Sequence, residues 1–364
     1  MHNAFSGRIF HKECKSLSKA GYKVVYIVQH DKDGEFDNVM IRALPGPGGR
    51  FDRMTRIVLR AYLLAVREDA VVYHIQDPEL IPLGILLKLH GKKVIYDVHE
   101  EYGGSMLYKT WLPSWLRFLT ARGVDLAEWI GAGFFDLIIT ATPHIAGKFP
   151  PAKTITIQNY PILDRWNPSV DIPYKERRPV LAYAGAITEL RGIREMLAAV
   201  KLLSCDLDVE LQVAGVFEPL NLAEELMKTS PSNVHYWGWQ SRQFVADMLA
   251  SAKIGLVLFH PVPNHIKSQP NKFFEYMAAG LPVVVSDFPL WREMVNESGC
   301  GLLVDPLKPE AIAEAISWLL GHPDEAEAMG KRGQDAASNI YNWDREAEKL
   351  IEAYDIMCKR ERPA

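Results

Sequence analysis

Two charged residues, Lys272 and Glu275, lie three positions apart in a short segment between Pro270 and Gly280. The proline and the glycine mark the start and the end of a predicted helix, from which both side chains project. A carboxylate such as Glu275 accepts two hydrogen bonds from a ribose diol, and the unpaired amides near Asn271 at the helix start bind phosphate. The segment therefore predicts a nucleotide site. The alternative is an ordinary exposed Glu on an amphipathic helix.

An apolar run follows this helix and indicates where the site lies in the fold. Val283, Val284 and Val285 are β-branched and do not alternate with polar residues. Such a run is typical of a parallel strand that is covered on both faces. The predicted helix therefore lies beside a buried sheet, where α/β proteins bind ligands.

The composition is that of a globular protein with room for two cores. The chain has 364 residues, of which 48% are hydrophobic and 24% are charged. Its formal net charge of −4 argues against nucleic acid as the main partner. The four cysteines lack the spacing of a disulfide scaffold or a zinc site, which fits a reducing cytoplasm. No apolar run reaches the roughly 18 residues of a membrane-spanning helix, and a signal-peptide pattern is missing. We therefore expect a cytoplasmic protein, soluble or peripheral on the membrane.

Predicted helices and strands alternate in two series. The first series has strands at 22–28, 71–75, 93–96, 137–140 and 154–158 and helices at 8–20, 53–67, 80–90 and 114–135. The second has strands at 180–183, 210–214, 234–236 and 254–258 and helices at 193–203, 221–228 and 242–250. This alternation is typical of α/β domains with parallel sheets.

A polar, proline-rich stretch separates the two series. We expect a first domain over 1–162, a linker over 163–179, a second domain over 180–339 and a final helical segment over 340–364. Open parallel sheets bind ligands at the carboxyl ends of their strands, so we expect the two sheets to face a central cleft.

One histidine of the first domain stands at such a strand end. His99 comes directly after a predicted buried strand. It either acts on a substrate or is a structural histidine that bonds to neighbouring backbone. Asp97, two residues earlier, either lines the same site or caps the loop.

Four motifs, in a fixed order and spread over nearly the whole chain, resemble one protein family. They are Arg8-Ile9-Phe10-His11-Lys12-Glu13 with Ala20-Gly21-Tyr22, Tyr96-Asp97-Val98-His99-Glu100, Tyr183-Ala184-Gly185 through Arg191-Gly192-Ile193, and the segment from Pro270 to Ser286. The chain resembles the GT-B glycosyltransferases of family 4. The resemblance implies two Rossmann-like domains, the first on the acceptor side and the second binding a nucleotide sugar. It also implies sugar transfer with retention of configuration, without a metal or another cofactor, and a final helix that crosses back to the first domain.

The resemblance and the residue types together assign roles to individual positions. We expect catalytic roles for His99 and Lys267, donor binding by Gly185, Arg191, Ser268, Asn271, Lys272, Glu275 and Trp239, and acceptor-side positions at Gly7, Arg8 and Asp97. Three of these have simpler alternatives. Arg191 is otherwise an exposed arginine at a helix start, and Lys272 otherwise lies on a solvated helix face. Trp239 either covers the nucleotide base or packs into the core.

Two positions depart from the family's pattern. Ala186 stands where a cation commonly binds the diphosphate, and Lys267 stands where many members have the first of two glutamates. A Ser-x-Pro-x-Lys-x-x-Glu arrangement that ends at Glu275 resembles a subset of the family. We therefore expect Lys267 or Lys272 to replace the lost cation. Because the chain starts at the loop that follows the family's first strand, we also expect the first domain to lack that central strand.

Aromatic and basic side chains mix along the chain between Leu107 and Trp129. This stretch either lies on a membrane surface, binds a lipid-linked acceptor or packs inside the protein. The expected partners are a nucleotide-sugar donor and a glycan, lipid-linked or small-molecule acceptor. Hexosyl transfer in polysaccharide or glycoconjugate biosynthesis is the favoured function. The alternatives are a non-catalytic nucleotide-sugar-binding protein and a GT-B epimerase.

Overall fold

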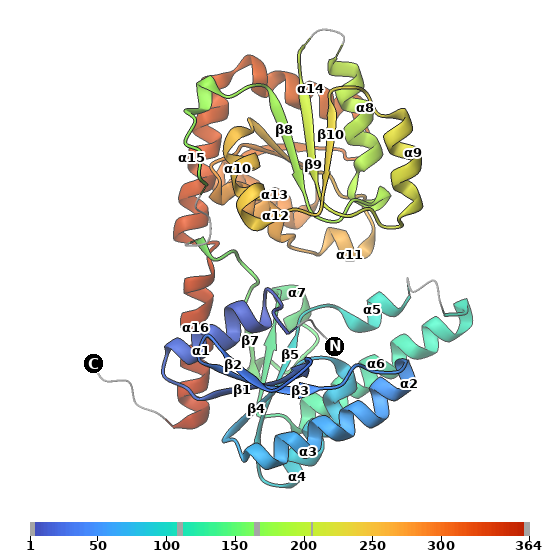
Figure 1. Ribbon diagram of the computed structural model, residues 1–364, viewed down its shortest axis with the longest axis vertical. Helices are drawn as coiled ribbons and strands as arrows, with labels where there is room; N and C mark the ends of the chain where they lie inside the picture. Colours follow the sequence, from blue (N-terminus) through green and yellow to red (C-terminus); the bar gives the residue numbers. More distant parts are fainter. Residues whose placement is uncertain (1–3, 108–111, 164–167, 205–206, 360–364) are drawn as a thin grey trace. The chain divides into compact units, whose positions relative to one another are not determined.

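The chain folds into two compact units (Figure 1). One comprises Met1–Asn159 with Trp343–Ala364, and the other comprises Tyr160–Asn342. The computed structural model describes residues 4–107, 112–163, 168–204 and 207–359. Residues 164–167 of the expected linker and 108–111 of the aromatic stretch lie outside these ranges. No helix within the ranges is both long enough and apolar enough to cross a bilayer.

The first unit contains two sheets. Its strands are β1 (Val24–Gln29), β2 (Gly34–Phe36), β3 (Val39–Leu44), β4 (Val72–Ile75), β5 (Lys93–Val98), β6 (Leu137–Thr140) and β7 (Thr154–Thr156). In the first sheet, β3 lies between β1 and β2, parallel to β1 and antiparallel to β2. The second sheet has the order β4-β5-β6-β7, with all neighbours parallel. Within the described residues, no strand joins the edge strands β1 and β4.

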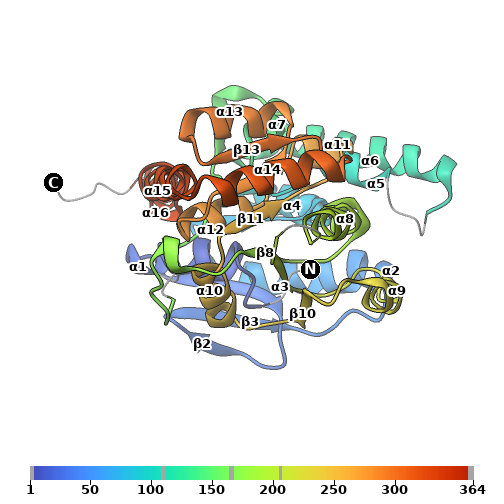
Figure 2. The same cartoon turned by 90° about the horizontal axis from the view of Figure 1, so that it is seen from above.

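Helices flank the two sheets of this unit (Figure 1). They are the π-helices η1 (Ile9–Cys14) and η2 (Arg53–Ile57), the 3₁₀-helices η3 (Pro78–Leu80) and η4 (Pro151–Lys153), and the α-helices α1 (Lys15–Lys19), α2 (Arg50–Asp52), α3 (Val58–Glu68), α4 (Ile81–Leu89), α5 (Tyr102–Met106), α6 (Ser114–Phe134), α7 (Pro143–Ala146) and α16 (Trp343–Cys358). Ala61 of α3, Leu87 of α4 and Ala132 of α6 share one core with Tyr96 of β5. Figure 2 shows α2 and α6 apart from each other.

The C-terminal helix α16 belongs to the first unit, although it follows the second in sequence. The Trp343 indole donates a hydrogen bond to Ser16 Oγ at 2.9 Å. Tyr354, farther along the same helix, bonds to His74 Nδ1 at 2.9 Å. These contacts attach both ends of α16 to elements from the first part of the chain.

The second unit is built on one six-stranded parallel sheet. Its strands are β8 (Val180–Ala184), β9 (Glu210–Ala214), β10 (Val234–Gly238), β11 (Ile254–Val257), β12 (Val283–Ser286) and β13 (Gly301–Val304), in the order β10-β9-β8-β11-β12-β13. Every residue of β8, β11 and β12 is buried. The continuous apolar runs seen in the sequence are therefore strands covered on both faces.

Helices supply the two cores on either side of this sheet. They are η6 (Tyr174–Glu176), η7 (Glu189–Arg191), α8 (Ile193–Leu203), α9 (Asn221–Thr229), α10 (Arg242–Ser251), α11 (Pro263–Ile266), α12 (Asn271–Ala278), α13 (Pro289–Ser298), α14 (Pro309–Gly321) and α15 (Pro323–Asn339). Met196 of α8 and Leu256 belong to one core, whereas Phe273 of α12 and Val257 belong to the other. The prediction of an α/β protein with parallel sheets in two domains is confirmed.

Candidate functional site

Two glycines shape the loops at the carboxyl ends of β8 and β9. Gly185 follows β8 with a φ of +126°, and Gly215 follows β9 with a φ of +153°. A Cβ at Gly215 would lie 1.8 Å from the carbonyl oxygen of Gly185, so only glycine fits there. The backbone of Gly185 remains exposed at this edge of the sheet.

Lys272, the second residue of α12, buries its amine against the end of β8. The residue is 7% exposed, and Nζ lies 3.5 Å from the centre of the Tyr183 ring. A Cβ added to Gly185 would lie 3.2 Å from Nζ. Within the described part of the chain, Nζ has no hydrogen-bond partner. A buried polar group without a partner is costly, so the position calls for an acceptor that the protein does not supply.

The pKa of Lys272 reflects this environment. Burial lowers it well below the ordinary lysine value, and the positive charge of Arg191 lowers it further. The negative charge of Glu275, one helical turn along α12, acts in the opposite direction. An anion beside Nζ would therefore favour the protonated amine.

Arg191 brings a second cation to the same place. Its guanidinium carbon lies 5.5 Å from the centre of the Phe259 ring, and Lys272 Nζ lies 5.6 Å from the same centre. Arg191 Nη1 donates a hydrogen bond to the carbonyl of Ala186 at 3.4 Å. Position 186, where the resemblance led us to look for a cation, thus contributes a backbone acceptor.

The start of α12 lies beside these two cations. The backbone amides of Asn271 and Lys272 belong to the first turn, where no preceding helical carbonyl is available to accept from them. Asn271 is exposed and Glu275 is half-buried. The hydroxyl of Tyr276 accepts a hydrogen bond from the Ala184 amide at 2.7 Å, which attaches α12 to the end of β8. Helix amides, two cations and a carboxylate therefore meet at one strand end.

Three other predicted donor-side residues are placed differently. The hydroxyl of Ser268 donates to the carbonyl of His265 at 2.9 Å, and its own carbonyl accepts from the Trp291 indole at 2.7 Å, so Ser268 stabilises the turn before α12. Lys267 is exposed at the end of α11. Trp239 is 78% exposed and does not pack into the core.

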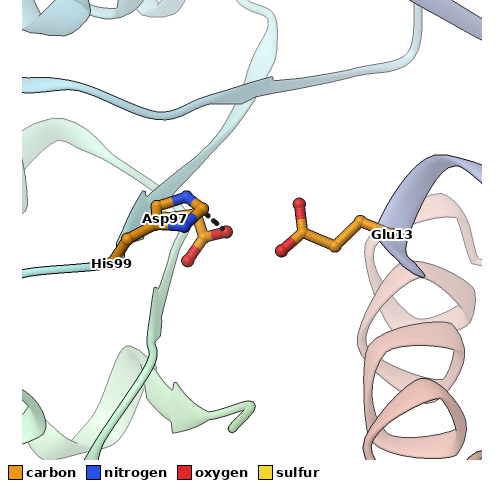
Figure 3. A group of neighbouring side chains, drawn as sticks. All are labelled: Glu13, Asp97 and His99. Carbon is orange, nitrogen blue, oxygen red and sulfur yellow. Dashed lines mark ion pairs between the residues drawn. The ribbon is translucent and has the colours of Figure 1, made fainter. Parts of the chain in front are cut away.

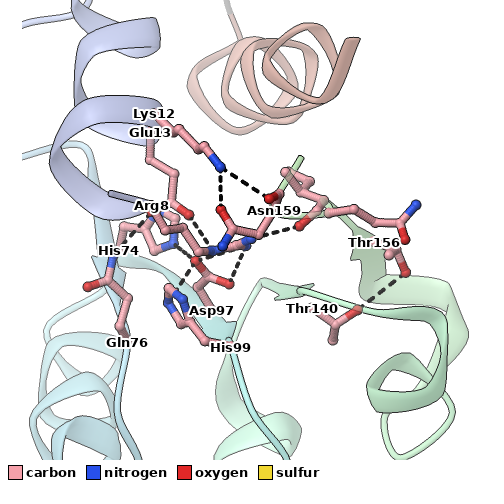
Figure 4. Close-up of polar contacts among 12 residues, drawn as sticks. Arg8, Lys12, Glu13, His74, Gln76, Asp97, His99, Thr140, Thr156 and Asn159 are labelled. Carbon is pink, nitrogen blue, oxygen red and sulfur yellow. Dashed lines mark hydrogen bonds and ion pairs between the residues drawn. The ribbon is translucent and has the colours of Figure 1, made fainter. Parts of the chain in front are cut away.

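In the first unit, the buried Arg8 contacts Asp97, another of the predicted acceptor-side residues (Figure 4). Arg8 Nε lies 2.8 Å from a carboxyl oxygen of Glu13, and Arg8 Nη2 lies 3.1 Å from a carboxyl oxygen of Asp97. Arg8 Nη1 donates to the carbonyl of Ile157 at 2.9 Å. Gly7, just before Arg8, is exposed, and an added Cβ would meet nothing within 4 Å.

The two carboxyl groups of this cluster differ in protonation. Burial alone would raise the pKa of Asp97, but the charge of Arg8 and contacts with His99 and His74 lower it well below its usual range. Burial, together with the negative charge of Asp97, raises the pKa of Glu13 well above its usual range, although Arg8 opposes this effect. The surroundings therefore favour the ionised form of Asp97 and the protonated form of Glu13.

Two histidines contact the fully buried carboxylate of Asp97. The Nε2 atoms of His99 and His74 lie 3.2 Å and 3.5 Å from Asp97 Oδ2. Figure 3 shows Glu13, Asp97 and His99 pointing toward one another, and one ligand atom from each lies within 4.8 Å of the others. Arg8 contacts both carboxyl groups and already supplies the positive charge that a metal ion would bring here. Asp97 thus orients other side chains and does not itself reach the surface.

Some residues of these two clusters were given no site role by the sequence analysis, although Glu13 and Tyr183 stand in its motifs. Tyr183 and Phe259 support the two cations, and Glu13 and His74 complete the cluster around Asp97. For Phe259 the sequence did carry a signal, because this residue lies just beyond the carboxyl end of β11, where α/β proteins bind ligands. An apolar ring at a strand end is, however, more often part of a core.

Comparisons with known proteins agree with this architecture. MMP alpha-(1->4)-mannosyltransferase of Mycolicibacterium hassiacum is 29% identical over 187 residues, which cover 50% of this chain and 44% of that protein. Alpha-maltose-1-phosphate synthase of Mycolicibacterium smegmatis is 25% identical over 277 residues, covering 70% of this chain and 68% of that protein. The crystal structure of HepE from Anabaena in complex with UDP and glucose has a TM-score of 0.72 and 14% identity, over 94% of both chains.

The fold is therefore that of the GT-B glycosyltransferases, as the sequence predicted. Residues 178–322 match the family described as Glycosyl transferases group 1. The matched region contains β8, α12 and both cations of the second unit. The chain spans less than half the length of the mannosyltransferase that it matches.

The cluster around Arg8 predicts a non-additive effect on stability. In Asp97→Asn, Glu13 can ionise and pair with Arg8, so we expect only a moderate decrease in the free energy of unfolding. The double variant with Glu13→Gln leaves the guanidinium buried without an ionised partner and should lower the free energy of unfolding by about 3 kcal/mol. Urea unfolding of the four proteins of this cycle measures the coupling. Asp287→Asn breaks an exposed pair and serves as the control, with a change within about 0.5 kcal/mol. If the losses of the two single variants add up to the loss of the double variant, Asp97 and Glu13 do not share the role of ionised partner to Arg8.

The raised pKa of Glu13 also predicts a pH dependence. The folded protein keeps a proton that the unfolded chain releases above its ordinary pKa of about 4.3. The stability that this proton contributes is full below that value and is lost as the pH rises through the folded-state pKa. Between pH 5 and pH 8, stability should therefore fall more for the unmodified chain than for Glu13→Gln. Glu310→Gln, at an exposed site, should keep the steeper dependence, and identical profiles for all three would contradict the assignment.

Proposed function

We propose that this chain is a retaining hexosyltransferase that moves a sugar from a nucleotide-sugar donor to a glycan, lipid-linked or small-molecule acceptor in polysaccharide or glycoconjugate biosynthesis. The observation that carries the proposal is the buried amine of Lys272, which has no hydrogen-bond partner among the described residues and lies near Arg191 and the first amides of α12. A diphosphate supplies the acceptor oxygens and the negative charge that this place lacks. The family match over residues 178–322 supports the same ligand.

In the proposed reaction, the bond between the anomeric carbon and a phosphate oxygen breaks, and negative charge develops on the diphosphate. Lys272 and Arg191 stabilise that charge more in the transition state than in the ground state. Glu275 accepts hydrogen bonds from the ribose diol. His99 and Lys267 are the proposed catalytic residues on the sugar side, and Trp239 is the proposed cover of the base. The two cations do the work that a metal ion would do, so we propose that none is required.

Two other functions use the same donor site. A protein that binds a nucleotide sugar without transferring it is favoured by two departures, the alanine at position 186 where a cation is common and the lysine at position 267 where a glutamate is common. A GT-B epimerase would convert the donor without an acceptor. Incubation with a panel of UDP-, GDP- and ADP-sugars separates the three, with thermal shift reporting binding and nucleoside diphosphate release reporting transfer. The panel is run with and without EDTA, which tests the proposal that no metal ion is required. Binding without release would support the binding protein, and no binding to any donor would sink the assignment.

Removal of the buried amine tests the role of Lys272. Lys272→Met keeps the volume of the side chain, and we expect turnover to fall by about 100-fold because one charge-stabilising donor is lost. The melting temperature should not fall, because Met removes a buried polar group that has no partner. Lys308→Met, at a residue that is 68% exposed, is the matched control and should keep full activity. Unchanged turnover in Lys272→Met would rule out the proposed role.

Donor binding should also take up a proton. The pKa of Lys272 is lowered in the free protein, chiefly by burial, and the diphosphate raises it again. Binding therefore moves a proton from buffer to protein and weakens as the pH rises. Calorimetric titration in buffers of different ionisation enthalpy should give an enthalpy that varies with the buffer, and this variation should vanish in Lys272→Met. If the buffer makes no difference to the unmodified chain, the amine is not the group that responds.

A further inference from the structure

Three basic side chains of the second unit lie next to the ring of Phe259. Two of them are Arg191 and Lys272, the cations of the proposed donor site. The third is His265 of α11, whose ring centre lies 4.6 Å from the centre of the Phe259 ring. His265 is half-buried, and neither the sequence motifs nor the expected donor-binding residues include it. A histidine without an assigned role therefore lies beside the same ring as both cations.

One hydrogen bond decides how His265 presents its two ring nitrogens. Its Nδ1 lies 3.3 Å from the carbonyl oxygen of His260. A carbonyl oxygen only accepts hydrogen bonds, so Nδ1 carries the proton and, in the neutral ring, Nε2 carries the lone pair. Burial lowers the pKa of His265, and the positive charge of Arg191 lowers it further, although the hydrogen bond to His260 opposes this effect. The surroundings therefore favour a neutral ring with Nε2 as an acceptor.

The Nε2 atom of His265 is available to a ligand. Within the described residues it has no hydrogen-bond partner, and it is not one of the buried polar atoms that lack a partner. It therefore differs from Lys272 Nζ, which is enclosed. The site thus offers one neutral acceptor beside two cations.

The loop that carries His265 is attached to the turn that carries Arg191. The amide of His260 donates a hydrogen bond to the carbonyl of Leu190 at 2.8 Å. The ring of His260 reaches the next helix, where its Nε2 lies 3.0 Å from a carboxyl oxygen of Glu195 in the first turn of α8. His260 therefore contacts His265 through its carbonyl and the Arg191 turn through its amide. These contacts fix the position of the acceptor relative to Arg191.

We propose that His265 is a further donor-binding residue, whose Nε2 accepts a hydrogen bond from a hydroxyl group of the transferred sugar. The oxygens of a diphosphate only accept hydrogen bonds, so they have nothing to donate to this nitrogen. The ribose hydroxyls are assigned to Glu275. The hydroxyls of the sugar remain, and the sugar is bonded to the diphosphate that Arg191 and Lys272 are proposed to bind. An acceptor placed for one hydroxyl discriminates against a sugar that lacks it.

The order of the strands agrees with this assignment. Four strands of the sheet lie side by side as β10-β9-β8-β11. Trp239, the proposed cover of the base, follows β10, and Lys272 lies against the end of β8. His265 follows β11, which is on the other side of β8 from β10. Along the carboxyl ends of the strands, the base, the diphosphate and the sugar of a bound donor would thus follow one another in that order.

The inference rests on the proposed function, and calorimetric titration of the whole chain tests it. The probes are UDP with UDP-glucose and GDP with GDP-mannose, and the pair that the unmodified chain binds more tightly is used. His265→Phe keeps a ring against Phe259 and removes Nε2. We expect it to weaken binding of the nucleotide sugar about fivefold to tenfold, the effect of one hydrogen bond, and to leave binding of the nucleoside diphosphate within about twofold.

Deoxy analogues of the same donor identify the hydroxyl group. The analogue that lacks the bonded hydroxyl should bind the unmodified chain about as weakly as the complete donor binds His265→Phe. Its affinity should not fall further in His265→Phe, because the interaction is already absent. If His265→Phe weakens every analogue as much as the complete donor, His265 does not contact a sugar hydroxyl.

His322→Phe is the matched control. The Nδ1 of His322 also lies near a backbone carbonyl, that of Trp318 at 2.8 Å, and its ring stacks on the Trp318 ring with the centres 4.4 Å apart. His322 is exposed after α14, so the same substitution there should change neither affinity.

Two results would overturn the inference and leave the proposed function intact. One is an equal loss of affinity for the nucleoside diphosphate and the nucleotide sugar in His265→Phe, which would place His265 on the phosphates or in the fold. The other is unchanged affinity for both probes. If the unmodified chain binds neither pair, the proposed function fails and the inference fails with it. A melting curve for each variant checks that it folds.

Discussion

The uncompensated amine of Lys272 is the feature on which the arrangement at the strand ends of the second unit depends. Burial of the amine and the nearby charge of Arg191 disfavour its charged form, whereas the face of the Tyr183 ring, 3.5 Å from Nζ, favours it. Because Nζ has no hydrogen-bond partner among the described residues, the free site is less stable than an apolar one would be. An anion offsets both unfavourable effects, because it supplies hydrogen bonds and opposite charge in a place from which water is largely excluded. Among the described residues, the protein thus places the Lys272 amine where a negative charge would stabilise it and supplies no hydrogen-bond acceptor of its own.

The cluster around Arg8 in the first unit differs from this site, because its buried cation has partners within the protein. Arg8 is as deeply buried as Lys272, but its donors reach Glu13, Asp97 and a backbone carbonyl. The raised pKa of Glu13 favours its protonated form and the lowered pKa of Asp97 favours its carboxylate, an arrangement in which one negative charge compensates the one guanidinium. A compensated cluster of this kind fixes side-chain positions and has no need of a ligand. Whether a buried cation has partners within the protein therefore distinguishes a positioning cluster from a binding site more clearly than residue type does.

Much of the second unit could be predicted because local pattern and tertiary role agree there. Helix α8 and strand β9 have the bounds that the sequence indicated, since apolar periodicity alone defines both. Strands β2 and β3 of the first unit were missed. Residues of β2 are mostly exposed, and the strand forms only by pairing with β3. Its identity therefore depends on a partner and is not carried by its own sequence.

The predictions for the site residues were likewise limited by contacts with residues distant in the chain. The sequence identified Lys272 but left a solvated helix face open as the alternative. The structure buries the residue because Tyr183 of β8 and Phe259, just beyond β11, lie against its amine. Asp97 was expected either to line the site or to cap a loop. Its partners Arg8 and His74 come from other elements, and no local pattern shows that they converge on it. Local sequence therefore shows which side chains are chemically able to form a site, whereas burial and distant partners decide which of them remain available to a ligand.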